Sequence, residues 1–319
     1  MGKQCYQREL SQLGDHAIRG MRILLLGRDG QLARALLPQL SALGTSGAIT
    51  AWGRAEVDMA NLVTLRTQVS QFAPNLIVNA AAYTAVDRAQ SEAQLCHTVN
   101  AQAPAVLAEV ADQIGAWLIH YSTDYVFNGT GTRAWRESDP IAPLNVYGES
   151  KAAGEALIRE RCERHLILRT SWVYAAHGQN FLRTILRLAA ERDTIKVVSD
   201  QIGAPTSAEL LAQVTVQAFA RTREGAVAGT YHLAPPGETS WFDYARLIVS
   251  TMRELGIRLR LAPESIVPIA AANYPTAAAR PLNSRLDTTK LRTQLAFALP
   301  AWEDDVVRTL RELAPGLQR

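Results

Sequence analysis

A tyrosine and a lysine stand four residues apart in the segment 145–154, which reads NVYGESKAAG. Tyr147 and Lys151 would face the same side of a helix, with their Cβ atoms about 5–6 Å apart. The pair suits hydride transfer to a ketone, because the carbonyl oxygen becomes an alkoxide that needs a proton. A nearby ammonium is expected to lower the pKa of the tyrosine from about 10 toward neutral pH. The alternative is two amphipathic side chains on a helix surface, since the spacing alone is common.

Three polar residues follow an apolar run that ends before them. Ser122, Thr123 and Asp124 come after the run at 116–121, and ligands bind at the carboxyl ends of parallel strands. The Thr123 hydroxyl is expected to orient the substrate oxygen, while Lys151 also holds the nicotinamide ribose. A simple turn capped by Asp124 is the alternative interpretation.

A glycine-containing turn near the start of the chain reads LLLGRDGQLARAL at 24–36. Gly27 and Gly30 stand between an apolar run and a helical pattern, with Ala33 where a third glycine is usual. Such a turn lets backbone N–H groups approach a pyrophosphate at a helix N-terminus. The pattern alone is weak, and glycines that merely turn the chain are the alternative.

The next strand end, AWGRAEVD at 51–58, places no acidic residue at its tip to bind a ribose hydroxyl. Arg54, together with Arg28 in the glycine turn, favours a 2′-phosphate and therefore NADPH over NADH. Asp58 either reaches the adenine side of the cofactor or caps the following helix.

These residues must be positioned by alternating strands and helices. Apolar runs that separate helical patterns predict parallel strands covered on both faces. Strands are expected at 22–27, 48–53, 74–82, 116–127 and 165–174, and helices at 31–43, 62–72, 96–115 and 150–162. The fold class is therefore α/β, with a Rossmann-type doubly wound parallel sheet and a smaller C-terminal α/β substrate-binding portion.

The predicted organisation has three parts. Residues 1–20 form an N-terminal extension, and residues 21–171 form the NAD(P)-binding Rossmann domain, to which parts of 190–222 return. Residues 172–319 form mainly a smaller substrate-binding portion, with helices at 180–192, 206–221 and 302–313, a strand at 194–200, and a Pro- and Ala-rich loop at 263–281.

Composition excludes several classes of protein. The 319 residues carry a net charge of +3, with 48% hydrophobic and 20% charged residues, so neither a nucleic-acid partner nor a membrane anchor is expected. Cys5, Cys96 and Cys162 are widely spaced, which argues against disulfides and a zinc site and favours a cytoplasmic protein. The first twenty residues lack the apolar stretch of a secretory signal.

Several longer motifs carry a family resemblance. They are GRDGQLA, VNAAAYTAVDRAQSE, IHYSTDYVFNG, PLNVYGESKAAGE, LRTSWVYAAHGQNF, SDQIGAPT and YPTAAARPLNSRLDTTK. In this order the chain resembles the extended short-chain dehydrogenase/reductases that act on nucleotide sugars and, among them, the dTDP-4-dehydrorhamnose reductases. The resemblance runs from Met21 to the C-terminus.

The resemblance implies reduction of the C4 keto group of dTDP-4-dehydro-L-rhamnose to dTDP-L-rhamnose, by NADPH or NADH. It makes Tyr147 the proton donor, Lys151 its partner and Thr123 the orienting hydroxyl. The implied cofactor contacts are Gly30, Gln31 and Leu32 at the pyrophosphate. The rest of the cofactor would be lined by Asp58, Met59, Ala82, Tyr83 and Thr84. The implied substrate contacts are Asp124, Trp172 and Arg280, the last at the diphosphate. Trp172 as a packed strand-end aromatic and Arg280 as a surface residue remain alternatives. Mg²⁺ and a homodimer come from the resemblance alone, because no local ligand cluster appears.

Two rival functions remain open. A nucleotide-sugar dehydratase of this fold is expected to carry Thr-Asp-Glu at the strand end, whereas this chain has Thr123, Asp124 and Tyr125. Dehydratases and epimerases also recycle NAD instead of consuming NADPH. The other rival is a non-catalytic cofactor-binding protein, like the regulatory subunit of methionine adenosyltransferase. The intact Tyr147 and Lys151 pair argues against it.

Overall fold

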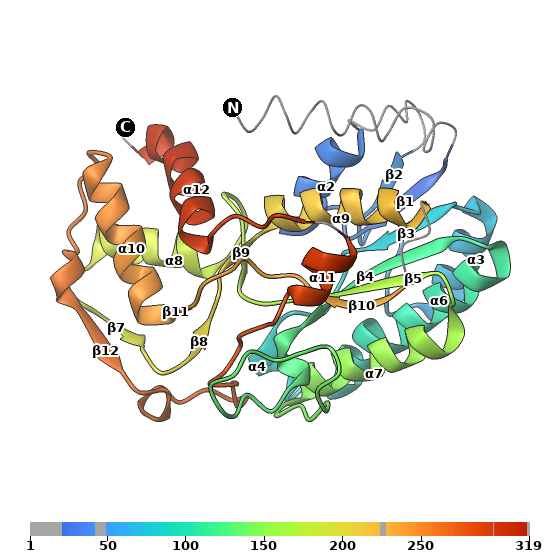
Figure 1. Cartoon of the computed structure of the whole chain (residues 1–319), viewed down its shortest axis with the longest axis horizontal. Helices are drawn as coiled ribbons and strands as arrows, with labels where there is room; N and C mark the ends of the chain where they lie inside the picture. Colours follow the sequence, from blue (N-terminus) through green and yellow to red (C-terminus); the bar gives the residue numbers. More distant parts are fainter. Residues whose placement is uncertain (1–20, 42–48, 224–227, 296, 318–319) are drawn as a thin grey trace.

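A six-stranded parallel sheet lies at the centre of the larger lobe (Figure 1). The computed structural model describes residues 21–41, 49–223, 228–295 and 297–317. The predicted extension at 1–20, with Cys5, and the predicted helix end at 42–43 lie outside these residues. The order across the sheet is β10 (Gly229–His232), β5 (His165–Thr170), β4 (Trp117–Thr123), β3 (Leu76–Asn79), β1 (Ile23–Leu26) and β2 (Ile49–Trp52).

Helices cover both faces of this sheet (Figure 1). The helices α2 (Gln31–Ser41) and α9 (Ala208–Arg223) enclose one apolar core with the sheet, and α3 (Leu62–Phe72), α6 (Ala103–Ile114) and α7 (Val146–Arg161) enclose another. The strands are apolar on both faces because both faces are buried. The predicted doubly wound fold is confirmed.

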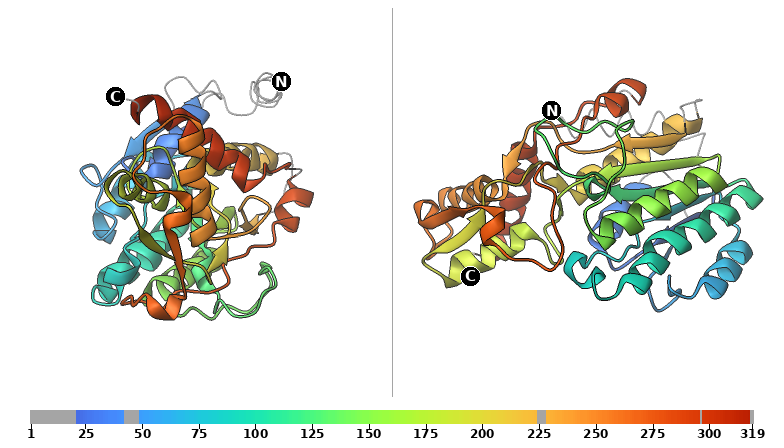
Figure 2. Two further views of the ribbon diagram at one scale, coloured as in Figure 1. Left: turned by 90° about the vertical axis from the view of Figure 1, so that its left-hand side faces the viewer. Right: turned by 90° about the horizontal axis from the view of Figure 1, so that it is seen from below.

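A second lobe has its own core (Figure 2). It consists of α8 (Phe181–Glu191), α10 (Trp241–Glu254) and α12 (Trp302–Leu317) around the parallel pair β7 (Ile195–Val198) and β12 (Ile266–Ile269). Two short strand pairs complete the sheets: β6 (Val173–Tyr174) with β9 (Thr206–Ser207), parallel, and β8 (Ile202–Gly203) with β11 (Thr239–Ser240), antiparallel. Further short elements include α4 (Val86–Ala89), η3 (Pro263–Ser265) and η4 (Ala271–Asn273).

The chain returns from the second lobe to the first. Helix α9 packs against α2, and β10 then pairs with β5, where Tyr231 lies opposite Leu168. Helix α11 (Thr289–Gln294) also contributes Leu291 to the core of the first lobe. The return therefore extends beyond the 190–222 segment that the sequence predicted.

Three predicted elements differ in detail. The helix predicted at 96–115 is α5 (Ala93–His97), a π-helical turn η1 (Thr98–Gln102) and then α6. The strand predicted at 116–127 ends at Thr123 and continues as the 3₁₀ turn η2 (Asp124–Val126). The strand predicted at 165–174 is broken at Trp172, whose φ of +50° belongs to the left-handed region. No helix among the described residues is long and apolar enough to span a membrane.

Candidate active site

Lys151 lies on α7, next to the carboxyl end of β4. The helix begins at Val146 because the Asn145 side chain accepts a hydrogen bond of 2.8 Å from the Gly148 N–H, which caps its first turn. Lys151 is 2% exposed. Its Nζ donates to the Tyr121 carbonyl oxygen at 2.6 Å and lies 3.1 Å from Nε2 of His120. Burial lowers the pKa of Lys151 to about 8.

Tyr147 lies one helical turn before Lys151 and is half-buried. Its ring packs edge-on against Tyr125, with centroids 5.7 Å apart, and its hydroxyl hydrogen-bonds Thr123. Burial raises the pKa of Tyr147, and the Asp124 carboxylate raises it further. The sequence-based expectation that Lys151 lowers this pKa is therefore wrong for this structure, because burial and the Asp124 carboxylate determine it. A raised pKa keeps the phenol protonated at neutral pH, which suits a proton donor.

Asp124 brings a buried carboxylate to the same strand end. The Thr123 hydroxyl donates to its Oδ1 at 3.1 Å, and Ser284 hydrogen-bonds it from the C-terminal half. Oδ2 is buried and finds no hydrogen-bond partner among the described residues. Burial raises the pKa of Asp124 to about 6. This oxygen is an acceptor at the site that the protein itself does not satisfy.

A buried ion pair supports α7 from behind. Glu155, one turn after Lys151, accepts hydrogen bonds from Arg169 of β5 at 2.8 and 2.6 Å. Burial alone would raise the pKa of Glu155, but the interactions with Arg169, Ser122 and Arg159 together lower it. Arg169 also lies over the Phe127 ring, 5.2 Å from its centroid. The pair connects α7 to the strand beside β4 and so fixes the helix that carries Tyr147 and Lys151.

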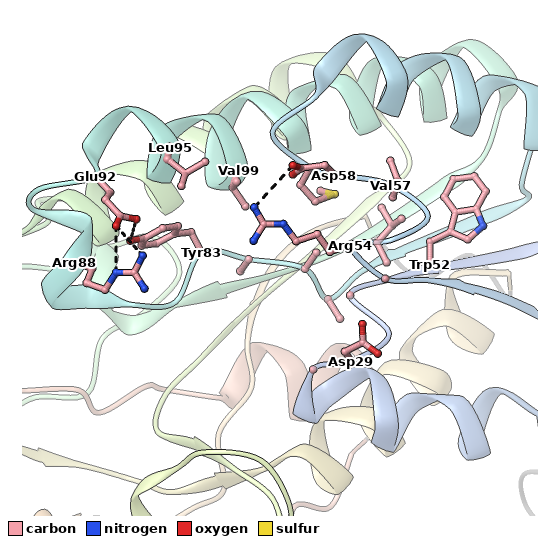
Figure 3. A pocket seen from close by; sticks show the side chains of 18 residues that line it. Asp29, Trp52, Arg54, Val57, Asp58, Tyr83, Arg88, Glu92, Leu95 and Val99 are labelled. Carbon is pink, nitrogen blue, oxygen red and sulfur yellow. Dashed lines mark hydrogen bonds and ion pairs between the residues drawn. The ribbon is translucent and has the colours of Figure 1, made fainter.

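A cavity of about 420 Å³ opens at the carboxyl ends of β1, β2 and β3 (Figure 3). Seven residues predicted to bind the cofactor line it: Gly27, Gly30, Arg54, Asp58, Met59, Ala82 and Tyr83. Gly27 has a φ of +89°, and a Cβ there would lie 2.8 Å from the Ala81 nitrogen. The first turn of α2 follows immediately, so its free N–H groups face an anion placed at this loop. These features fit a dinucleotide.

Other predicted cofactor residues lie outside the lining of this cavity. The Gln31 side chain accepts a hydrogen bond of 2.7 Å from Asn180, Leu32 packs against the apolar core, and Thr84 is exposed. Arg28 donates to Glu56 at 2.8 Å. Arg54 is turned toward Asp58, with 3.9 Å between Nη2 and Oδ2 (Figure 3). Arg54 is therefore the cation that the loop after β2 contributes to the lining of this cavity.

A second cavity, of about 540 Å³, lies between the lobes. Its lining combines aromatic rings with cations and amides, among them Tyr125, Phe181, Lys196, Gln201, Trp241, Tyr274 and Arg280. Arg280 donates to Asp87 at 2.8 Å and hydrogen-bonds Tyr125. Trp172 lies outside the lining and stacks on Trp241, with ring centroids 3.6 Å apart. The site thus has aromatic faces for a base and a guanidinium for a diphosphate.

The model of the RmlD substrate binding domain matches residues 21–314. The chain belongs to the RmlD family. A dTDP-4-dehydrorhamnose reductase of Escherichia coli is 48% identical over 295 residues, which cover 92% of this chain and 98% of that protein. The crystal structure of dTDP-4-dehydrorhamnose reductase from Bacillus anthracis in complex with NADP is 34% identical, has a TM-score of 0.83, and covers 92% of this chain and 99% of that one. The family predicted from the motifs is confirmed.

A more distant structure shares the fold alone. DesIV, a dTDP-glucose 4,6-dehydratase from Streptomyces venezuelae, is 19% identical with a TM-score of 0.74, and covers 91% of this chain and 96% of that one.

The sequence prediction missed several residues of this RmlD-family site. His120 contacts Lys151, Glu155 and Arg169 form the buried pair, and Trp241 lines the second cavity. A polar residue inside an apolar strand is the signal that His120 and Asn79 carry, because strands buried on both faces seldom contain one. No group of three or more metal-ligating side chains occurs in the described part of the chain.

Proposed function

We propose that this protein reduces the C4 keto group of dTDP-4-dehydro-L-rhamnose to dTDP-L-rhamnose with NADPH, in the synthesis of L-rhamnose for surface polysaccharide. One observation carries the proposal. Helix α7 packs against η1, whose Val99 lines the first cavity, and against η2, whose Tyr125 lines the second. Tyr147, Lys151, Thr123 and Asp124 line neither cavity, but Tyr147 lies on the helix between them and packs against Tyr125 of the second lining, which supports a role where the two ligands would meet.

Each proposed role follows from the surroundings of the side chain. NADPH, held by residues of the first cavity, would supply a hydride for C4 of the sugar. Tyr147 holds a proton on its hydroxyl and gives it to the C4 oxygen as negative charge develops there. Thr123, which is hydrogen-bonded to Tyr147, orients that oxygen, and the free Oδ2 of Asp124 accepts from a sugar hydroxyl.

The decisive experiment measures NADPH oxidation with the product of the preceding dehydratase and epimerase reactions as substrate. We expect one NADPH to be consumed for each dTDP-L-rhamnose formed. A protein that binds NADPH but never oxidises it with this keto-sugar would be a binding protein instead. Turnover without net NADPH consumption would indicate a dehydratase or epimerase.

Cofactor choice is expected to depend on Arg54. Its side chain is 82% exposed at the cavity that would hold the adenosine ribose, so its guanidinium can bind a 2′-phosphate there. The Arg54→Ala variant should have an about tenfold higher KM for NADPH, equivalent to ~1.4 kcal/mol, and an unchanged KM for NADH. Steady-state kinetics with both cofactors test this, and an equal loss with both would contradict the assignment.

Arg280 is expected to bind the diphosphate of the sugar nucleotide. Removing its guanidinium in Arg280→Met should raise the KM for the dTDP-sugar about tenfold or more, the usual effect of losing one charge-assisted contact. Arg260→Met is the matched control, since Arg260 also forms an ion pair, with Asp193, but lies outside both cavity linings. Equal KM values for the two variants would argue against a phosphate contact.

We also infer a cytoplasmic protein, because Cys96 and Cys162 are buried free thiols and no disulfide joins described residues. A homodimer is proposed on the family resemblance, and the molar mass in solution tests it.

A further inference from the structure

A chain of hydrogen bonds runs from the backbone of β3 to the lysine of the site. The Ala81 N–H donates to Oδ1 of Asn79 at 3.2 Å. The Nδ2 of Asn79 lies 3.1 Å from Nδ1 of His120, and Nε2 of His120 lies 3.1 Å from Nζ of Lys151. Asn79, His120 and Lys151 are all buried. Each group in this chain must therefore find its partner inside the protein.

The Ala81 N–H at one end of this chain of hydrogen bonds fixes where each of the other protons lies. A backbone N–H can only donate, so Asn79 must present Oδ1 to Ala81 and its NH₂ group to His120. A neutral imidazole has one donor and one acceptor nitrogen, so Nδ1 of His120 must be the acceptor and Nε2 the donor. His120 is neutral because burial lowers its pKa well below the usual range.

We propose that Asn79 and His120 are positioning residues that hold Lys151 as a hydrogen-bond acceptor, with the His120 proton on Nε2 directed at Nζ. A neutral amine has one lone pair for this bond and two N–H groups, one of which donates to the Tyr121 carbonyl oxygen. When Nζ gains a proton it has no lone pair, so the imidazole proton must move to Nδ1. There it faces the Asn79 NH₂ group, and two donors oppose each other. Protonating Lys151 therefore costs the bond between Asn79 and His120.

The remaining titratable groups near Lys151 act differently. Burial lowers the pKa of Lys151, whereas Glu155 on the same helix and Cys96 on α5 raise it. Arg169 of β5 engages Glu155 directly. The Asn79 and His120 chain acts in the same direction as burial, and Lys151 exchanges its proton near pH 8, one helical turn after Tyr147. The tautomer stands on the hydrogen bonds alone, and only its use in turnover rests on the proposed function.

The histidine tautomers test this proposal directly, without substrate or cofactor. Long-range ¹H–¹⁵N spectra of the full chain labelled with ¹⁵N-histidine distinguish the two neutral forms. At about pH 9, above the pKa of Lys151 at which its amine is neutral, we expect His120 to carry its proton on Nε2. Two buried histidines in the same spectrum serve as controls with the opposite tautomer: Nδ1 of His165 lies 2.6 Å from the Cys162 carbonyl oxygen, and Nδ1 of His232 lies 3.0 Å from that of Trp135. A His120 protonated on Nδ1, or on both nitrogens, would overturn the proposal. Through-space NMR contacts from the His120 ring to Tyr121 and Lys151 identify its signal, so the assignment needs no variant.

One substitution reverses the chain. In Asn79→Asp the carboxylate still accepts from Ala81 and now also accepts from Nδ1 of His120, so the imidazole proton should move to Nδ1. His120 then accepts from the Lys151 ammonium, and the limb of the pH–rate profile that Lys151 contributes should move up by about one pH unit or more. Asn75→Asp, at the opposite end of the same strand and bonded to the Arg22 N–H, adds the same charge and should change neither quantity.

The outcomes separate this proposal from the proposed function. An Asn79→Asp variant that keeps His120 protonated on Nε2, or an Asn75→Asp variant with the same pH shift, would overturn the relay. If Asn79→Asp fails to fold, the tautomer in the unmodified protein decides. If the protein does not reduce the keto-sugar, the tautomer measurement still stands and only the proposed function fails.

Discussion

The Tyr147→Phe variant is expected to reduce the keto-sugar about 10²-fold or more slowly than the unmodified protein, the usual contribution of a general acid. The phenol is the proton source beside Thr123, and burial keeps it protonated at neutral pH. Phenylalanine keeps the ring that packs edge-on against Tyr125, so the fold and cofactor binding should be retained. Single-turnover kinetics and NADPH titration measure the two effects separately.

Tyr174→Phe is the matched control for this variant. It also removes one buried phenol oxygen, but from the core of the second lobe. Its turnover should be close to that of the unmodified protein. Near-normal turnover of Tyr147→Phe would remove Tyr147 from the chemistry, whereas equal losses in both variants would indicate a general effect of deleting a buried hydroxyl.

The Glu155→Gln variant is expected to lose about 3 kcal/mol or more of the free energy of unfolding at pH 7, because it leaves the Arg169 guanidinium buried without its carboxylate. Arg169 is 2% exposed. The pKa of Glu155 is lowered in the folded protein, so its stabilisation is fully present above the unfolded pKa of about 4.3, begins to fall below that pH, and is lost as pH falls through the lower folded pKa. Urea unfolding at pH 7 and at pH 4 measures both quantities, and the difference between the proteins should shrink at the lower pH.

Glu109→Gln supplies the comparison. Glu109 also lies between two arginines, Arg66 and Arg161, but these pairs are partly exposed. Exposed pairs contribute about 0–1 kcal/mol, so this variant should remain within that range. If Glu155→Gln cost no more than Glu109→Gln, the buried pair would not be what secures α7 to β5.

Much of the fold follows from patterns that are local in the chain. Runs such as ILLL of β1 and LIVN of β3 are apolar on both faces, and only a parallel sheet between two helical layers buries them. The i, i+4 spacing of Tyr147 and Lys151 likewise places both side chains on one helical face, wherever that helix packs.

Other features depend on neighbours that the sequence does not name. The sequence alone did not assign 229–232 to a strand, and its place beside β5 is set by how α9 returns over the sheet. The π-helical turn at 98–102 has the composition of an ordinary helix. This turn packs closely against α7 at Gly154, where a Cβ would lie 2.2 Å from the Asn100 carbonyl oxygen. The partner of Lys151 was also unpredictable, because His120 is 31 residues away and reaches Nζ only through the register of β4 against α7.

The late arrival of β10 has a consequence for synthesis on the ribosome. Strand β5 ends at Thr170, and its outer edge is covered only when Gly229 and the residues after it have been made. At about 5–20 residues per second, this gap of roughly sixty residues leaves the nascent sheet with an open edge for about 3–12 s. An unpaired parallel edge is a template for other chains. We therefore expect the yield of folded protein to rise when chaperones cover this edge during that interval.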